Sequence, residues 1–128
     1  MKKLLALALT LTLAASVFAA EYPEITIKEL KPLIGSPKVT LIDVNGSESF
    51  NSGHIPGAID YQASQDKLAS LLPKDKNALI VAYCGNPRCK AYLQGATKAE
   101  KLGYKNDKHL TAGIAGWKDA GEKTEAAK

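Results

Sequence analysis

A short apolar run that ends at a cysteine constrains the fold of this chain more than any other feature. Residues Leu79–Tyr83 have the sequence LIVAY, which is apolar and rich in strand-forming side chains, and Cys84 follows directly. A polar turn comes next, and a helical pattern is predicted from Cys89 to Leu102. A strand, a short turn and a helix in this order are typical of an α/β domain with a parallel sheet.

Strands and helices alternate along the rest of the chain, which predicts one α/β domain whose mostly parallel central sheet is flanked by helices. Besides the run before Cys84, strands are predicted at residues 39–44, 58–61 and 109–110. Helices are predicted at residues 27–34, 48–51 and 65–72 and after residue 113, and the first begins with a capping box between Thr26 and Glu29. Residues 122–128 are predicted to be a frayed tail.

The N-terminal segment predicts export. Two lysines precede an apolar run, residues 4–15, and the small-residue pattern SVFAA follows at residues 16–20. This order is that of a secretory signal peptide, and cleavage after Ala19 fits it best. Because the run is short for a membrane span, we expect removal of residues 1–19 rather than a retained anchor. The mature chain would then be periplasmic or secreted, with no stable membrane association.

The mature chain, residues 20–128, is long enough for one domain with a modest core, expected at about residues 23–121. The net charge of the full chain is +4, and it falls to +2 once Lys2 and Lys3 are removed. The lysines are scattered and aromatic side chains are few, so the composition gives no support to nucleic-acid binding.

Cys84 stands where chemistry is expected. Free backbone N–H groups at the N-terminus of a helix favour an anion at the carboxyl end of the preceding strand. A thiol in this position should ionise readily, and the thiolate is the reactive form. Cys84 is therefore the candidate nucleophile, and an inert, half-buried cysteine is the alternative.

Several motifs resemble those of the rhodanese-like sulfurtransferase family and occur in the family's order. LIDV at residues 41–44 and GHIPGA at residues 53–58 resemble its LIDVR…GHIPGA signature, and YC at residues 83–84 resembles the start of its active-site loop. LGY at residues 102–104 and AGIAGW at residues 112–117 resemble its closing motifs. The match extends over nearly the whole mature chain and implies a single rhodanese-like domain.

The resemblance implies that Cys84 accepts a sulfane sulfur and becomes a persulfide, whose negative charge is cradled by the turn that follows. The implied donor is a small sulfur anion, thiosulfate or polysulfide, and the implied acceptor is a thiol or a cyanide-like thiophile. We expect no cofactor and no metal ion. The residues assigned to the cradle are Gly85, Asn86, Arg88, Cys89 and Lys90.

The loop departs from the family pattern, which is Cys-x-x-Gly-x-Arg followed by Ser or Thr. Pro87 stands at the glycine position, Cys89 at the arginine position and Lys90 at the hydroxyl position. Pro87 has no N–H, so the cradle loses one donor. Arg88, the only arginine of the chain, is expected to contact the anion, and a solvated loop charge is the alternative. Asn45 replaces the arginine that often follows IDV.

Cys89 has two interpretations. It is either a helix-start residue without a chemical role or a resolving thiol that forms a disulfide or trisulfide with Cys84. An oxidising compartment and the turn-forming residues 85–87 favour the bond, which requires Cα atoms within about 7 Å. A loop this short constrains the unfolded chain little, so we expect a reversible bond rather than a structural staple.

Asp43 and His54 are expected to order loops. Asp43 ends a predicted strand, where its carboxylate would accept backbone hydrogen bonds, and a catalytic carboxylate is the minor alternative. His54 stands among glycines and a proline that fix a turn, which favours packing and hydrogen bonding over a role as a base. His109 lies on a predicted short strand and has no motif around it.

Other functions compete with sulfur transfer. The main alternative is a dithiol redox protein that cycles Cys84 and Cys89, although thioredoxin-type cysteines have only two residues between them. A metal module that uses both cysteines and a histidine would normally need a second such pair. A cysteine phosphatase would need an arginine at Lys90, because lysine lacks the planar fork that clamps phosphate. Non-catalytic interaction domains of the family often lack the cysteine that is present here.

Overall fold

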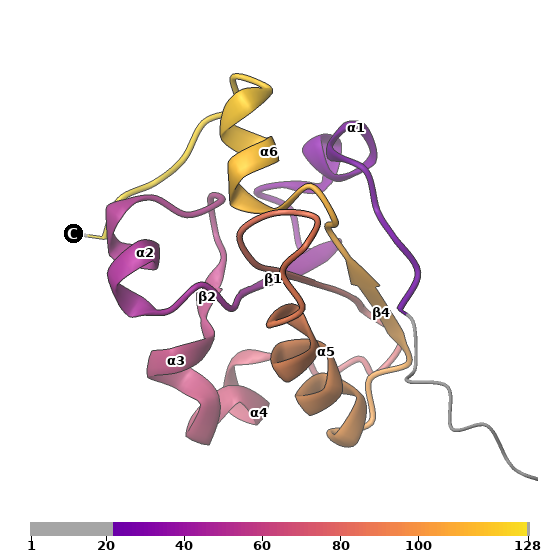
Figure 1. The fold of residues 1–128 in the computed structure, drawn as a ribbon. Coiled ribbons are helices and arrows are strands. Elements are labelled where there is room, and N and C mark those ends of the chain that lie inside the picture. The colour runs from indigo at the N-terminus through magenta and orange to yellow at the C-terminus, as the bar shows by residue number, and fades with distance from the viewer. Residues whose placement is uncertain (1–21, 128) are drawn as a thin grey trace, which may run out of the picture.

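A computed structural model describes residues 22–127 of the 128-residue chain (Figure 1). The expected signal peptide, residues 1–19, lies outside the described residues. Within the described part, no helix is both long enough and apolar enough to cross a bilayer.

The described residues contain one sheet of four parallel strands in the order β2-β1-β3-β4. The strands are β1 (Val39–Asp43), β2 (Ile59–Asp60), β3 (Leu79–Tyr83) and β4 (Asn106–His109). β3 is central, and it pairs with β1 over five residues. A strand covered on both faces favours a continuous apolar run, which is why LIVAY is visible in the sequence. The predicted α/β class with a parallel sheet is confirmed.

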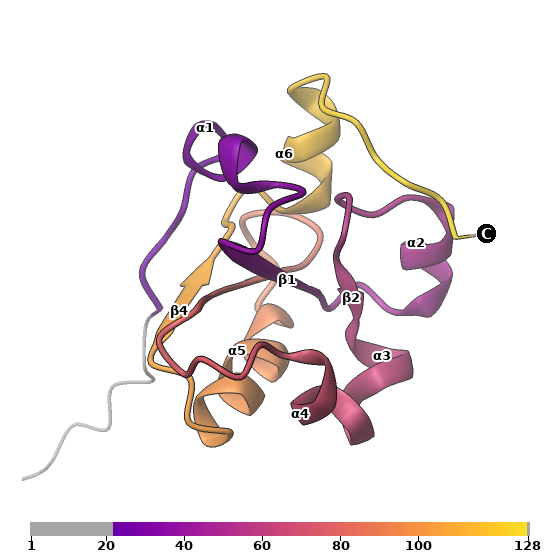
Figure 2. The same ribbon diagram turned by 180° about the vertical axis from the view of Figure 1, so that it is seen from behind.

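Helices cover both faces of this sheet (Figures 1 and 2). On one side lie α1 and α6, and on the other lie α3, α4 and α5. The helical elements are α1 (Ile27–Leu30), η1 (Lys31–Leu33), α2 (Ser47–Ser52), α3 (Tyr61–Ser64), η2 (Gln65–Lys67), α4 (Leu68–Leu71), α5 (Tyr92–Lys101) and α6 (Gly113–Asp119).

Two hydrophobic clusters form the core, one on each face of the sheet. Val81 of β3 belongs to the cluster under α1 and α6, and its neighbour Ile80 belongs to the cluster under α4 and α5. Successive side chains of a strand point to opposite faces, so one strand supplies both clusters. The first cluster contains Ile25, Leu30, Leu41, Ile55, Val81, Tyr83, Leu110, Ile114 and Trp117. The second contains Ile42, Leu68, Leu72, Ile80, Ala82, Ala96, Ala99 and Tyr104.

Two predicted helix ends have the expected capping geometry. At the start of α1, the Glu29 N–H donates to Thr26 Oγ1 at 3.1 Å, and the Thr26 N–H donates to Glu29 Oε2 at 3.0 Å. This reciprocal pair is the predicted capping box. After α5, Gly103 has φ +98°, and Tyr104 N–H donates to Ala99 O at 3.1 Å. Glycine tolerates this left-handed conformation, so the chain turns back sharply toward β4.

The largest differences from the predicted elements concern three segments. The helix expected from Cys89 begins at Tyr92, because the preceding residues close a turn of their own. The helix expected at residues 65–72 is split into η2 and α4, because Lys67 has non-helical backbone angles, and Ser64 likewise separates it from α3. The strand expected at residues 109–110 is β4, which runs from Asn106. β4 lies at the sheet edge and carries polar side chains, so no apolar run marks it.

The C-terminal tail, predicted to be frayed, is docked. Glu125 and His54 exchange two backbone hydrogen bonds of 2.9 Å, and the Trp117 indole N–H donates to Lys123 O at 2.8 Å. The tail therefore runs from α6 to α2, as Figure 1 shows. The prediction was wrong because the tail is held mainly by backbone hydrogen bonds. Such bonds do not require apolar side chains, so the polar sequence of the tail gives no sign of them.

Gly95 sets the distance between α5 and β1. A Cβ at this position would lie 2.9 Å from Ile42 Cγ2 and 3.1 Å from Val44 Cγ2. Alanine favours a helix over glycine by about 1 kcal/mol, but overpacking of a core costs about 1–3 kcal/mol. We therefore expect Gly95→Ala to lower the free energy of unfolding in urea by about 1 kcal/mol. Gln94→Ala, on the exposed face of α5, is the control, and a stabilised Gly95→Ala would contradict this packing.

Candidate functional site

Cys84 stands at the carboxyl end of β3 and is bonded to Cys89 by a disulfide. The two Cα atoms are 6.2 Å apart, within the usual range for disulfides. Cys84 is only 1% exposed, whereas Cys89 is partly exposed and lies three residues before α5. The structure thus joins the two thiols that the sequence places in one loop, which we call the cysteine loop (residues 84–91).

A tight turn brings Cys89 back toward Cys84. The Cys89 N–H donates to Asn86 O at 3.1 Å, and the Arg88 N–H donates to the Asn86 side-chain Oδ1 at 2.9 Å. Asparagine at the first position and proline at the second both favour such a turn. Asn86 and Pro87 therefore provide the local geometry that makes the disulfide accessible.

The same turn uses donors that the sequence assigns to an anion cradle. Asn86 occupies the amides of Arg88 and Cys89, and Pro87 has no N–H. The Arg88 side chain is exposed and takes part in neither of the ion pairs found in residues 22–127. Lys90 is also exposed. In the disulfide form, the two cationic side chains are therefore the loop's clearest contacts for an anion.

The start of α6 fixes the other side of the cysteine loop. The Ile114 N–H donates to Cys84 O at 2.9 Å, and the Ala115 N–H donates to Gly85 O at 3.0 Å. Gly113 has φ +65°, and a Cβ there would lie 2.6 Å from the Gly85 carbonyl carbon. Only glycine allows this approach, which gives a physical reason for the glycine in the AGIAGW motif.

Asp43 links three segments below the cysteine loop. Its carboxylate accepts the Tyr83 O–H at 2.7 Å and the Asn45 N–H at 2.8 Å. The Tyr83 hydroxyl in turn accepts the Ile55 N–H at 3.1 Å. Burial, together with the charge of Asp43, raises the pKa of Tyr83 far above its ordinary value, so its hydroxyl stays a neutral donor. Asp43 thus connects β1 and β3 with the GHIPGA loop.

His54 lies with α2 and the C-terminal tail rather than beside the cysteines. Its ring stacks on Phe50 with centroids 3.7 Å apart, and its Nδ1 lies 2.8 Å from Phe50 O. The other ring nitrogen, Nε2, lies 3.8 Å from Glu125 Oε2. These contacts place His54 among groups that hold its loop, and not on the cleft described next.

A cleft of about 450 Å³, the Cys89 cleft, opens on the β4 side of the cysteine loop. His109, at the end of β4, forms part of its wall and is only 6% exposed. Its ring stacks on Tyr92 with centroids 3.3 Å apart, its Nδ1 lies 3.5 Å from Thr111 Oγ1, and its Nε2 is buried without a partner. The cleft is lined by Tyr22, Pro23, Glu24, Pro87, Cys89, Lys90, Tyr92, His109 and Thr111.

Sequence analysis missed His109 as a site residue. Burial lowers the pKa of His109, the nearby Lys90 lowers it further, and Glu24 opposes both effects. The imidazole is therefore neutral at pH 7. Its position in the sheet could have indicated it. β4 pairs with β3 in parallel, and parallel strands end at the same edge of a sheet, so the end of β4 lies beside Cys84.

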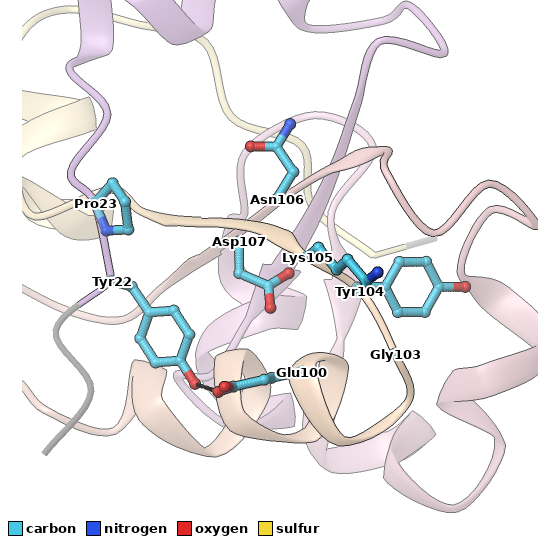
Figure 3. A pocket seen from close by; sticks show the side chains of 8 residues that line it. All are labelled: Tyr22, Pro23, Glu100, Gly103, Tyr104, Lys105, Asn106 and Asp107. Carbon is cyan, nitrogen blue, oxygen red and sulfur yellow. Dashed lines mark hydrogen bonds between the residues drawn. The ribbon is translucent and has the colours of Figure 1, made fainter.

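A second cleft of about 440 Å³, the Asp107 cleft, lies around the first half of β4 (Figure 3). The Asp107 side chain projects toward Glu100, whose carboxylate accepts the Tyr22 O–H. Asp107 Oδ1 is buried without a hydrogen-bond partner. Burial and the charge of Glu100 raise the pKa of Asp107 to about 6. Among the described residues, no three His, Cys, Asp or Glu side chains gather in a group suited to a metal ion.

Comparison with known proteins agrees with this architecture. The sequence profile of the rhodanese-like domain matches residues 26–120. The chain belongs to the rhodanese-like family. This family includes sulfurtransferases, whose substrates are a sulfur donor and a thiol acceptor.

Individual relatives differ in length and in the functions that their names state. The chain is 36% identical over 110 residues to the HTH-type transcriptional regulator Rv0324 of Mycobacterium tuberculosis. The aligned residues cover 84% of this chain and 47% of the regulator. The chain thus spans about half the length of that relative. Human single-domain sulfurtransferase TSTD1 is 25% identical, with a TM-score of 0.58 over 77% of this chain and 97% of its own. Thiosulfate sulfurtransferase of Pseudomonas aeruginosa shares the fold, at 23% identity and a TM-score of 0.66 over 84% of this chain and 20% of its own.

We expect Tyr83→Phe to destabilise the protein although it removes only a hydroxyl. The buried Asp43 carboxylate would lose one donor and the Ile55 N–H would lose its acceptor. An unsatisfied buried polar group costs about 1–3 kcal/mol, so urea unfolding should show a loss in that range. A change below about 0.5 kcal/mol would contradict the linking role of this pair.

We expect Asp107→Asn to stabilise the protein at neutral pH and not in acid. The folded-state pKa of Asp107 is about 6, above its ordinary value of 3.8, so the folded protein holds the proton more tightly than the unfolded chain. Stability is therefore lost as pH rises from about 4 to about 6. Because the cleft is open to water, the gain of the variant at about pH 8 should be only about 1 kcal/mol.

Urea unfolding at about pH 4 and about pH 8 tests this expectation. The exposed Asp66→Asn is the control and should give the same difference at both pH values. A gain in Asp107→Asn that does not change with pH would contradict the assigned role of burial.

Proposed function

We propose that the chain is an exported sulfurtransferase or sulfur carrier that moves sulfane sulfur through a persulfide on Cys84. The observation that carries the proposal is a cysteine at the carboxyl end of the central strand of a rhodanese-like domain. Export rests on the signal-like residues 1–19. Hydrogen bonds from the start of α6 support the proposal, because they hold the backbone of Cys84 and Gly85 in place before any substrate arrives.

Loading begins from the protein with a free Cys84, after an external thiol has opened the disulfide. The Cys84 thiolate attacks the outer sulfur of thiosulfate, a new sulfur–sulfur bond forms, and the old one breaks. Sulfite leaves with the electron pair, and Cys84 carries the persulfide. With polysulfide as donor, a shorter polysulfide leaves instead. The exposed cations Arg88 and Lys90 attract either anion, an effect that salt screens.

Discharge follows one of two routes. An acceptor thiolate attacks the outer sulfur of the persulfide and carries it away, which returns Cys84 as a thiolate. Without an acceptor, the Cys89 thiolate attacks the Cys84 sulfur, the disulfide forms, and hydrosulfide leaves. The second route supports a resolving role for Cys89, because its product is the bond that joins the two residues in the folded chain.

A dithiol redox function is the second candidate, and the disulfide itself favours it. In that case Cys84 and Cys89 exchange two electrons with a partner thiol pair, and no sulfur atom is transferred. The two functions differ in mass balance: sulfur transfer adds a sulfur atom to the protein, whereas redox cycling only adds or removes two hydrogen atoms.

Mass spectrometry of the reduced mature protein treated with thiosulfate or polysulfide separates the candidates. We expect Cys89→Ala to keep the mass of one extra sulfur on the Cys84 peptide, because its resolving thiol is gone. Cys84→Ser should gain none, and the unsubstituted protein should return to the disulfide and release hydrosulfide. The thermal midpoint of Cys89→Ala should change little, because the closed loop is short.

Two outcomes would overturn the assignments. Loss of two hydrogen atoms in the unsubstituted protein, with no added sulfur in any variant and no released hydrosulfide, would establish redox cycling instead. Loading of Cys84→Ser together with no loading of Cys89→Ala would reverse the roles of the two cysteines.

A further inference from the structure

The two sulfur atoms of the disulfide differ in access. Cys84 is 1% exposed and does not line the Cys89 cleft. Cys89 is partly exposed and forms part of the cleft wall. A nucleophile that arrives from solvent therefore meets the Cys89 sulfur first, although Cys84 is the residue assigned to sulfur chemistry.

The Cys89 cleft also contains a side chain that lacks a partner. His109 is 6% exposed, and its Nε2 is buried without a hydrogen bond. Buried polar atoms almost always have a partner, so the unpaired Nε2 of a residue that lines the cleft is the group there that most lacks one. The ring itself is fixed, because it stacks on Tyr92 and its Nδ1 faces Thr111.

The size and lining of the cleft suit a small molecule. Its volume of about 450 Å³ lies in the range of small-molecule sites. Four segments form its walls: the N-terminal residues 22–24, the cysteine loop, the start of α5 and the end of β4. Its charged groups are one acid, Glu24, and one base, Lys90. One charge of each sign places no strong demand on the net charge of the ligand.

We propose that the Cys89 cleft binds a low-molecular-weight thiol, which opens the disulfide at Cys89 with His109 as the proton acceptor. The thiol proton moves to His109 Nε2, and the thiol sulfur forms a bond to Cys89 Sγ. The Cys84–Cys89 bond breaks, and its electron pair leaves on Cys84 as a thiolate. The products are a mixed disulfide on Cys89 and a free Cys84 nucleophile.

Neutral His109 is required for this step. Burial keeps its imidazole unprotonated at pH 7, with Lys90 acting in the same direction and Glu24 against it. The other groups that face the ring are Tyr92 from α5 and Thr111 beyond β4, and Tyr22 lines the cleft as well.

The inference rests on the proposed function in one respect: the released Cys84 thiolate is the species that loading requires.

The first test locates the mixed disulfide. Oxidised mature protein is treated briefly with 2-mercaptoethanol, quenched with acid, alkylated at low pH and sequenced by tandem mass spectrometry. We expect the mercaptoethanol adduct on Cys89 and the alkyl group on Cys84. An adduct on Cys84 would overturn the proposal.

The second test removes the proton acceptor. His109→Phe keeps an aromatic ring against Tyr92 but lacks the proton acceptor Nε2. His109→Asn is a second variant, which lacks both the proton acceptor and the ring. At pH 7 we expect disulfide opening by 2-mercaptoethanol to slow by about 10-fold or more in both. Lys108→Gln, on the same strand and outside the cleft, should match the unsubstituted protein.

The pH profile separates proton transfer from a structural effect. The rate advantage of the unsubstituted protein over His109→Phe should shrink as pH falls through the pKa of His109, which burial holds below the ordinary histidine value of 6.5, because protonated His109 accepts no proton. Thermal unfolding checks that the oxidised variants are folded. Equal opening rates in folded variants, or a rate ratio that does not vary with pH, would overturn the role of His109.

The remaining outcomes distinguish this inference from the proposed function. A disulfide that resists small thiols and opens only with a protein dithiol such as thioredoxin would overturn the small-thiol site. A Cys89 adduct without any sulfur loading of the reduced protein would overturn sulfur transfer alone. Normal loading with an adduct on Cys84 would overturn this inference alone.

Discussion

The close backbone contact between Gly113 and the cysteine loop is the constraint on which the site depends. It lets the first amides of α6 reach the carbonyls of Cys84 and Gly85. The backbone of the cysteine loop is therefore held by α6 as well as by its own turn. Below it, the buried Asp43–Tyr83 pair joins β1, β3 and the GHIPGA loop. Cys84 is thus positioned by tertiary contacts as well as by the turn that follows it.

Asn86 and Pro87 change what the cysteine loop offers. In a loop that cradles an anion, backbone amides point at the ligand. Here Asn86 binds two of those amides, proline removes a third, and the resulting turn brings a second sulfur to Cys84. The cysteine loop thus offers fewer free amides to an anion and a covalent partner to Cys84. This arrangement fits the proposal that Cys84 is held in a disulfide until another thiol releases it.

Features encoded in neighbouring residues could be predicted from the sequence, and features made by distant ones could not. The strand before Cys84, the Thr26 capping box and the glycine that ends α5 all depend on local patterns. The pairing of the two cysteines was also accessible, because their turn lies between them. In contrast, β4 carries polar side chains, and the unpaired atoms of His109 and Asp107 result from how strands and helices meet. No run of residues marks a buried nitrogen that lacks a partner.

The backbone pairing of Glu125 with His54 has a consequence for the motions of the molecule. The C-terminal tail closes over α2 and reaches the GHIPGA loop, whose Ile55 amide is bound to Tyr83. Amide hydrogen exchange at the chain end and in this loop should therefore occur through shared opening events rather than through independent fraying. A segment that resembles a disordered end in composition thus belongs to the cooperative unit that surrounds β3.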